Sequence, residues 1–218
     1  MTYRALACDY DGTIATAGRV DAGTIEALSR LKGHGWSLIL VTGRMLEDLR
    51  LVFPGLDLFD LAVVENGGIL FRPAEKKFLT LAPVPSDGLV KDLRQAGIPI
   101  TAGHVVLATE RKWASSVTEF LAARGVSLQL VYNRDSLMLL PQGVDKASGL
   151  RAAIKELALM PDECVGVGDA ENDRALLSTC GLGVAVGNAV QELKEEADFI
   201  TDAPAGGGVV ELIDRLLM

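Results

Sequence analysis

The sequence alternates short apolar runs with segments whose apolar residues recur at helical spacing. Apolar runs of strand length occupy residues 4–8, 36–41 and 60–64, and helical patterns at 24–31 and 44–53 separate them. Strands that alternate with helices in this way favour a parallel sheet covered by helices, with right-handed connections. The predicted fold class is therefore α/β with a parallel sheet.

The middle of the chain departs from this rhythm. Residues 69–71 and 78–81 are two apolar strands around a polar turn with Pro73, which predicts an antiparallel hairpin. The next segment has its own two helical patterns and three strand-length runs, and the earlier rhythm resumes after Pro141. A segment of about 60 residues is near the lower size limit of an independent domain. The expected domains are a core formed by residues 1–82 and 142–218 and an insert formed by residues 83–141.

Composition predicts a folded protein that does not bind nucleic acid. The 218 residues are 49% hydrophobic and 23% charged, enough apolar surface to form a core. Lys and Arg number 21 against 29 Asp and Glu, so the net charge is 21 − 29 = −8, and no long basic run occurs. This acidity argues against a nucleic-acid partner. An anionic substrate would need local neutralisation, by a metal ion and a few placed cations.

The sequence also bears on cellular compartment. The N-terminus lacks a basic flank followed by an apolar stretch, and no apolar run approaches about 18 residues. Cys8, Cys164 and Cys180 lack the CxxC spacing of metal or redox sites, which favours reduced thiols. We expect a soluble cytoplasmic protein with no membrane partner, either a monomer or a homodimer.

The stretch DYDGT, residues 9–13, places two carboxylates directly after the first apolar run. Loops after the carboxyl ends of parallel strands form the ligand crevice of open sheets, so Asp9 and Asp11 are expected there. An ordinary Asp-Gly turn is the structural alternative, and this stretch alone leaves both open. The residues that follow do not fit a calcium-binding EF-hand loop, and GxSxG and HExxH are absent.

Three other places have the same relation to a predicted strand or helix. Thr42 and Gly43 follow the run at 36–41, Asp169 follows the run at 164–168, and Lys146 begins a predicted helix. A hydroxyl and a glycine amide after a strand can hold a phosphate, and a lysine would add positive charge.

Acidic residues would dominate such a crevice. Asp169 and Asp173 are four residues apart where a helix begins, so both can reach one ion. Helix capping is the alternative for Asp173, and it stays open. Together with Asp9 and Asp11 they would repel one another unless a cation neutralised them, and all-oxygen ligands favour Mg²⁺. The predicted cofactor is Mg²⁺.

Four motifs in order resemble those of the haloacid dehalogenase (HAD) superfamily: DYDGT at 9–13, VTGR at 41–44, Lys146 and GDAEND at 168–173. The resemblance spans the whole chain. It implies a Rossmann-like core with a parallel sheet and a small inserted α/β cap domain, residues 83–141, of the C2 (IIB) type. The motifs ENGG at 65–68 and GVDK at 143–146 resemble the Cof-like branch. Phosphoglycolate and sucrose-phosphate phosphatases and phosphomannomutase belong to this class.

The resemblance implies a role for each motif residue. Asp9 would attack phosphorus and form an aspartyl-phosphate, and Asp11 would act as acid and base. The implied metal ligands are Asp9, Asp11 through its backbone oxygen, Asp169 and Asp173. The implied phosphate-binding residues are Thr42, Gly43, Arg44, Lys146 and Asn172, and Asn172 and Asp173 could alternatively orient water ligands or Lys146.

Three functions compete at this stage. A Mg²⁺-dependent phosphatase of a small phosphorylated metabolite, 2-phosphoglycolate or a sugar phosphate, is favoured, because Asp11 suits ester chemistry. A phosphomannomutase-like phosphotransferase would use the same residues, and a module that binds phosphate without turnover is the third. Cationic candidates for substrate contact in the insert are Arg111, Lys112, Arg124 and, preferred, Arg134 in the turn YNRDS.

Overall fold

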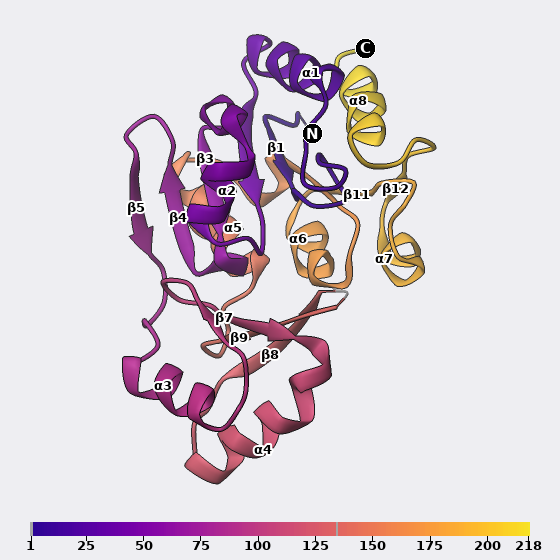
Figure 1. Cartoon of the computed structure of the whole chain (residues 1–218). Coiled ribbons are helices and arrows are strands. Elements are labelled where there is room, and N and C mark those ends of the chain that lie inside the picture. Colours follow the sequence, from indigo (N-terminus) through magenta and orange to yellow (C-terminus); the bar gives the residue numbers. More distant parts are fainter. Residues whose placement is uncertain (1, 134) are drawn as a thin grey trace.

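The protein is described as a computed structural model that covers residues 2–133 and 135–218. Two β-sheets occupy opposite ends of the molecule, and each is covered by helices (Figure 1). The larger sheet is mainly parallel and the smaller one is antiparallel. The fold class is α/β, as the sequence predicts.

The larger sheet has eight strands in the order β12-β11-β10-β1-β2-β3-β4-β5. Its strands are β1 (Ala5–Cys8), β2 (Ser37–Val41), β3 (Leu61–Val64), β4 (Ile69–Arg72), β5 (Lys77–Thr80), β10 (Cys164–Gly168), β11 (Leu182–Ala185) and β12 (Phe199–Ile200). Neighbours pair in parallel except at β3-β4 and β4-β5, where the predicted hairpin adds antiparallel strands at one edge. Strands β10, β1 and β2 lie side by side, so the loops after them meet at one edge of the sheet.

Helices cover both faces of this sheet. The first face carries α1 (Ala22–Gly33), α2 (Leu46–Val52) and α8 (Ala205–Leu216), and the second carries α5 (Lys146–Glu156), α6 (Arg174–Thr179) and α7 (Gln191–Glu196). Strand β2 shows how the sequence creates two faces. Leu38 and Leu40 pack with the first group of helices, whereas Ile39 and Val41 pack with the second.

The smaller sheet has the order β6-β7-β9-β8 and lies below the larger one in Figure 1. Its elements are β6 (Thr101–Ala102), β7 (Leu107–Glu110), β8 (Gln129–Asn133) and β9 (Ser136–Leu140), with helices α3 (Asp87–Gln95) and α4 (Ala114–Arg124). The helices cover the side away from the larger sheet (Figure 1). On the other side, Met138 and Leu140 join the apolar cluster of the first face. The assignment of residues 83–141 as a cap domain remains a proposal.

Helix α8 begins at Ala205, a start that its local sequence does not predict. The glycines at 206–208 argue against a helix by propensity, and packing overrides that preference. A Cβ atom at Gly206 would lie 2.2 Å from Thr24 Oγ1, and one at Gly208 would lie 2.4 Å from Thr201 Oγ1. The glycines therefore let α8 pack closely against its neighbours. The short strand β6 and two 3-10 helices, Glu65–Gly67 and Glu171–Asp173, were also not predicted.

Two further features concern membrane-spanning helices and the cysteines. Among the described residues, no helix combines the length and the apolar character that crossing a membrane requires. Cys8, Cys164 and Cys180 are free thiols, and the first two are buried. Burial raises the pKa of the Cys164 thiol to about 11, which keeps it protonated at neutral pH.

Candidate active site

The predicted site residues gather at the carboxyl edge of the larger sheet. Asp9 directly follows β1, Thr42 follows β2, Asp169 follows β10, and Lys146 is the first residue of α5. All four side chains are buried, and so is Asp173 at the start of α6. The topology explains this convergence, because parallel neighbours end at the same edge.

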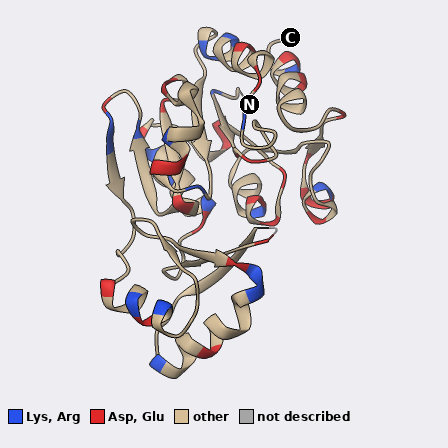
Figure 2. Ribbon diagram, in the orientation of Figure 1, with Lys and Arg blue, Asp and Glu red and all other residues tan. Residues whose placement is uncertain are grey.

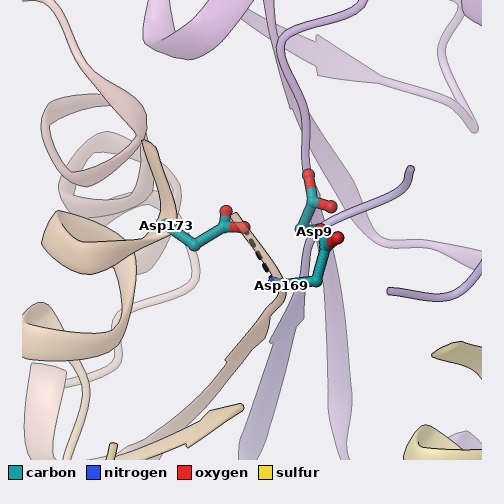
Figure 3. A group of neighbouring side chains, drawn as sticks. All are labelled: Asp9, Asp169 and Asp173. Carbon is teal, nitrogen blue, oxygen red and sulfur yellow. Dashed lines mark hydrogen bonds between the residues drawn. The ribbon is translucent and has the colours of Figure 1, made fainter. Parts of the chain in front are cut away.

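Three carboxylates form a compact cluster. Asp9, Asp169 and Asp173 each offer an oxygen, and these oxygens lie within 4.8 Å of one another. The carboxylates of Asp9 and Asp169 lie next to each other at the ends of adjacent strands, and Asp173 reaches toward them from the opposite side (Figure 3). An all-oxygen donor set at this spacing fits a hard divalent cation such as Mg²⁺.

Lys146 partly neutralises the cluster. Its Nζ donates hydrogen bonds of 2.6 Å to Asp9 Oδ1 and of 2.6 Å to Asp173 Oδ1. The side chain is directed there because α5 begins at Lys146, fixed by a capping box between Asp145 and Ser148.

Burial and charge shift the acidity of both partners. Desolvation raises the pKa of Asp9, and although Lys146 lowers it, Asp173 and Asp169 raise it further, to about 8. Burial lowers the pKa of Lys146, but Asp173 and Asp9 outweigh burial and hold that pKa above its ordinary value. A lysine that stays charged beside Asp9 suits a site for a phosphate dianion.

The carboxylate of Asp173 has several partners. Oδ1 accepts the bond from Lys146, and Oδ2 accepts the backbone amides of Asp169 and Ala170, both at 3.0 Å. These bonds favour the alternative in which Asp173 orients Lys146 and the loop that carries Asp169. Its role as a direct metal ligand remains a prediction.

Gly12 allows the loop after β1 to approach Asp169. Its φ is +83°, and a Cβ atom there would lie 2.2 Å from Asp169 Oδ2. The left-handed backbone and the lack of space both call for glycine. The next residue, Thr13, donates its hydroxyl to Asp169 Oδ1 at 3.4 Å, and the amide of Asn188 donates to the Gly12 carbonyl at 2.9 Å.

The side chain of Asp11 lies apart from the three-carboxylate cluster. Arg44 holds it in a two-pronged ion pair, Nε to Oδ2 at 2.6 Å and Nη2 to Oδ1 at 2.8 Å. Arg44 also contacts Asp48 at 2.5 Å. The structure therefore brings Arg44 to the site as a partner of Asp11, whereas the sequence predicts a phosphate contact, and that contact stays untested. The metal contact predicted for the Asp11 backbone oxygen likewise stays a prediction.

A hydrogen-bonded pair of asparagines lies near Gly43, one of the phosphate-binding candidates after β2. Asn172 Nδ2 donates to Asn66 Oδ1 at 3.2 Å. A Cβ atom at Gly43 would lie 3.9 Å from Asn66 Oδ1 and 3.2 Å from Met138 Sδ. Asn66 Nδ2 and Asn172 Oδ1 are buried with no hydrogen-bond partner among the described residues. These atoms are suited to meet a substrate or an ordered water.

A cavity of about 650 Å³ opens beside Asp11, between the two sheets. The larger-sheet side supplies Asp11, Gly12, residues 15–18, Asn188 and Ala205. The smaller sheet supplies Asn133, Asp135 and Ser136, which flank the β8-β9 turn. The volume suits a small metabolite.

The cationic residues of the insert that are candidates for substrate contact differ in their position relative to the cavity. Arg134, the preferred one, lies outside the described residues. The Arg111 amide donates to the Asp135 carbonyl at 2.7 Å, which puts Arg111 next to the turn that lines the cavity. Lys112 pairs with Glu110, and Arg124 pairs with Asp92 on α3.

Sequence reasoning missed Asn66, Met138 and Asn188. Asn66 lies in ENGG, which the sequence offers only as a family resemblance, and Met138 reads as an ordinary strand residue. Asn188 joins two distant segments, because its Oδ1 also accepts the Ala205 amide at 2.6 Å. A single sequence carries no signal for such long-range contacts.

The sequence is similar to known proteins along nearly its full length. The family model of haloacid dehalogenase-like hydrolases matches residues 6–119 and 105–213. Phosphoglycolate phosphatase 2 of Saccharolobus solfataricus is 30% identical, over 97% of this chain and 91% of that protein. Phosphoglycolate phosphatase of Methanothermobacter thermautotrophicus is 28% identical, over 98% of this chain and 99% of that protein.

Solved structures share the fold at lower sequence identity. A haloacid dehalogenase-like hydrolase from Bacteroides thetaiotaomicron superposes with a TM-score of 0.85 at 21% identity, covering 99% of this chain and 100% of that one. A sugar phosphatase of HAD subclass IIB superposes with a TM-score of 0.79 at 19% identity, covering 97% and 98%. These neighbours thus share the fold over nearly the whole of each chain.

Proposed function

Because this chain belongs to the haloacid dehalogenase-like hydrolases, we propose that it is a Mg²⁺-dependent phosphatase that cleaves a small phosphate ester through an aspartyl-phosphate on Asp9. One observation carries the proposal. Asp9 lies buried between the Lys146 ammonium, 2.6 Å away, and the Asp169 carboxylate. The cavity begins at Asp11, two residues further along the chain. The arrangement supports the proposal, because Asp9 as nucleophile, Lys146 as cation and the proposed metal ligands would then surround one point.

In the first half of the reaction, a carboxylate oxygen of Asp9 attacks phosphorus, and the bond from phosphorus to the ester oxygen breaks. Asp11 donates a proton to the departing oxygen. Thr42, the Gly43 amide and Lys146 stabilise the charge on the phosphoryl oxygens. Asp9 and Asp169, with Asp173 and the Asp11 backbone oxygen as further candidates, would hold Mg²⁺, which when bound offsets the repulsion between Asp9 and the phosphate.

In the second half, Asp11 takes a proton from the water that attacks the phosphorus of the aspartyl-phosphate. Free phosphate leaves, and Asp9 is restored. The pair with Arg44 suits this role, because both Asp11 oxygens accept bonds from Arg44 as those of a carboxylate do, and the pair fixes where the group points. For Asp11 to donate a proton in the first half, one of these two bonds has to open. Splitting the displacement at Asp9 replaces one difficult step by two easier ones.

The substrate we propose is 2-phosphoglycolate or a sugar phosphate of similar size. Two lines of support favour a small ester: the cavity of about 650 Å³ beside Asp11, and the names of the relatives, several of which are phosphoglycolate phosphatases. The turn residues Asn133, Asp135 and Ser136 would contact the leaving group.

Phosphate release from a panel of esters tests this function. The panel holds 2-phosphoglycolate, hexose phosphates and an aryl phosphate, each with Mg²⁺ and with a chelator. We expect Mg²⁺-dependent release that Asp9→Asn lowers by about 10⁴-fold or more. Asp57→Asn, which changes an exposed aspartate, is the matched control and should keep wild-type activity.

Two outcomes would contradict the proposal. One is the absence of turnover on every ester by a protein with an intact circular dichroism spectrum. The other is a phosphoryl group that reappears on a sugar in place of free phosphate, which would favour the phosphotransferase.

For Asp11→Asn, we expect a larger loss of activity with alkyl esters than with the aryl ester, because a poor leaving group depends more on proton donation.

A further inference from the structure

The segment Glu65–Gly68 follows β3, and the phosphatase mechanism does not use it. We propose that Glu65 is a positioning residue that holds the smaller sheet in place over the active site. Its buried carboxylate would do so by binding the β6-β7 turn. The inference rests on the proposed function, because it concerns how substrate meets that site.

The carboxylate of Glu65 binds three consecutive amides of the β6-β7 turn. Oε1 accepts the His104 amide at 3.0 Å, and Oε2 accepts the amides of Val105 at 2.7 Å and Val106 at 3.0 Å. Glu65 is completely buried. A buried carboxylate is costly unless it is well hydrogen-bonded, and charge-assisted bonds are about twice as strong as neutral ones. These bonds thus make a directional link between the two sheets.

Three glycines leave room for this contact. A Cβ atom at Gly103 in the turn would lie 2.6 Å from Glu65 Oε2, and one at Gly68 would lie 2.7 Å from Val105 Cβ. A Cβ atom at Gly67 would lie 2.0 Å from the carbonyl oxygen of Asp145, just before Lys146. The segment therefore contacts both the turn and the connection by which the chain returns to the larger sheet.

The backbone of the same segment is tied to the phosphate-binding loop. The Glu65 amide donates to the Arg44 carbonyl at 2.9 Å, and the Asn66 amide donates to the Thr42 carbonyl at 3.0 Å. Glu65 and Asn66 have φ values of 52° and 53°. Non-glycine residues in this left-handed region are strained, and such strain persists where surrounding contacts impose it. The segment thus connects the phosphate-binding loop with the smaller sheet.

The smaller sheet brings residues to the active site, and its position therefore affects substrate binding. Met138 of β9 lies over Gly43, and the β8-β9 turn lines the cavity beside Asp11. If Glu65 no longer held the sheet, contacts to the leaving group would loosen. The phosphoryl pocket itself is formed by the larger sheet and would keep its shape.

Variants on both sides of the contact test the inference. Glu65→Gly removes the carboxylate and suits the positive φ, so the fold should be retained, and Glu65→Gln keeps the shape but removes the charge. Gly103→Ala pushes into the same contact from the smaller sheet. Glu75→Gln, which removes an exposed charge in the nearby hairpin, is the matched control.

Two readouts separate positioning from general damage. We expect faster hydrogen exchange at the amides of residues 104–106 in Glu65→Gly, measured without substrate. We also expect the KM for the best ester of the panel, 2-phosphoglycolate in the first instance, to rise about tenfold or more. The inhibition constant of inorganic phosphate should stay within about twofold, because the residues proposed to bind the phosphoryl group all belong to the larger-sheet side.

The variants also make a coupled prediction. Gly103→Ala should raise KM in the wild-type background and add nothing in the Glu65→Gly background, because the contact it disturbs is already lost. Unchanged exchange at residues 104–106, or an equal loss of phosphate and ester binding, would overturn the role of Glu65. Absence of wild-type turnover would instead overturn the proposed function, and the exchange measurement would still decide whether Glu65 holds the turn.

Discussion

At the scale of single residues, the site concentrates buried charge. Asp9 and Asp173 share the ammonium group of Lys146, and the Asp169 carboxylate offers an oxygen within 4.8 Å of theirs. Burying charge costs free energy that its partners must offset. In the metal-free protein the protonation of Asp9 must therefore respond to pH.

The metal-free protein should become less stable as pH rises. The pKa of Asp9 is raised to about 8 in the fold, against about 4 in an unfolded chain. The folded state binds this proton more tightly, so its contribution to stability is complete below pH 4 and is lost as pH rises through 8. Asp9→Asn cannot titrate. Thermal unfolding in chelator should show Asp9→Asn gaining stability relative to wild type between pH 5 and pH 8.5.

Asp57→Asn serves as the control, since an exposed carboxylate should give a small difference that does not change over this range. Added Mg²⁺ should stabilise the wild type at pH 8.5, because a ligand that binds only the folded state shifts unfolding toward higher temperature. A constant difference between Asp9→Asn and wild type across the pH range would contradict a proton held by Asp9.

The sequence predicts the charged residues of this site better than the neutral ones. Asp9, Asp169 and Lys146 are visible because each follows a strand or begins a helix, and topology then brings them together. Asn66 and Asn188 have no such marker. Their positions depend on contacts with Asn172 and Gly12, more than 100 residues away in sequence. The pairing of Arg44 with Asp11, which are 33 residues apart, likewise depends on a tertiary contact that the sequence does not mark.

At the scale of elements, periodicity predicts strands and helices where the two faces of an element lie in clearly different surroundings. Strand β2 alternates between two apolar clusters, and its predicted range, 36–41, agrees to within one residue with the observed Ser37–Val41. Helix α8 shows the limit of this approach, because the two glycines that weaken its helical signal, Gly206 and Gly208, are those that permit close packing on Thr24 and Thr201. Local propensity thus fails where tertiary contact decides.

The start of α5 gives an element-scale prediction. Asp145 caps this helix by accepting the Ser148 amide at 2.7 Å, and Ser86 caps α3 in the same way by accepting the Leu89 amide at 3.2 Å. Replacing either cap by alanine should lower the free energy of unfolding by about 1 kcal/mol. Only Asp145→Ala should also lower kcat, by about tenfold or more, because Lys146 is the next residue.

Urea unfolding and phosphate release measure the two effects separately. Ser86→Ala is the matched control, since it removes an equivalent cap from a helix that lies away from the larger sheet (Figure 1). Equal kcat values for Asp145→Ala and Ser86→Ala would show that the cap stabilises the helix without positioning Lys146.

At the scale of the whole molecule, the two sheets share one apolar cluster. Val105, Met138 and Leu140 of the smaller-sheet segment pack with Tyr10 and Val64 of the larger-sheet segment. The sequence predicts an insert from its changed rhythm and its prolines. The sequence could not predict that the insert packs on the larger sheet through a shared apolar cluster. The residues that join the two sheets look like ordinary core residues of separate strands.

Charge is also distributed unevenly at this scale. Acidic and basic side chains are spread over the helices and loops, whereas the strands of both sheets are largely free of them (Figure 2). The net charge of −8 would repel an anionic ester at long range. Neutralisation at the site, by Lys146 and the proposed Mg²⁺, is therefore required for an anion to bind.

The shared cluster predicts that both sheets unfold together. The two tryptophans report on different parts, because Trp36 packs on the cluster of the larger sheet and Trp113 on the separate cluster of the smaller sheet. Single-tryptophan proteins, made by Trp113→Phe or Trp36→Phe, should give the same urea midpoint by fluorescence. Leu139→Ala, which truncates a residue buried only in the smaller-sheet cluster, should lower stability by about 2–5 kcal/mol.

The decisive comparison is where that loss is seen. If the sheets form one cooperative unit, Leu139→Ala shifts the midpoint reported by Trp36 as far as the midpoint reported by Trp113. The apolar contacts of Met138 and the bonds of Glu65 would then transmit a loss in one sheet to the other. If Leu139→Ala shifts only the Trp113 midpoint, the smaller sheet unfolds on its own. The sheet would then exchange between positions on and off the active site, and substrate binding would have to favour the position on the site.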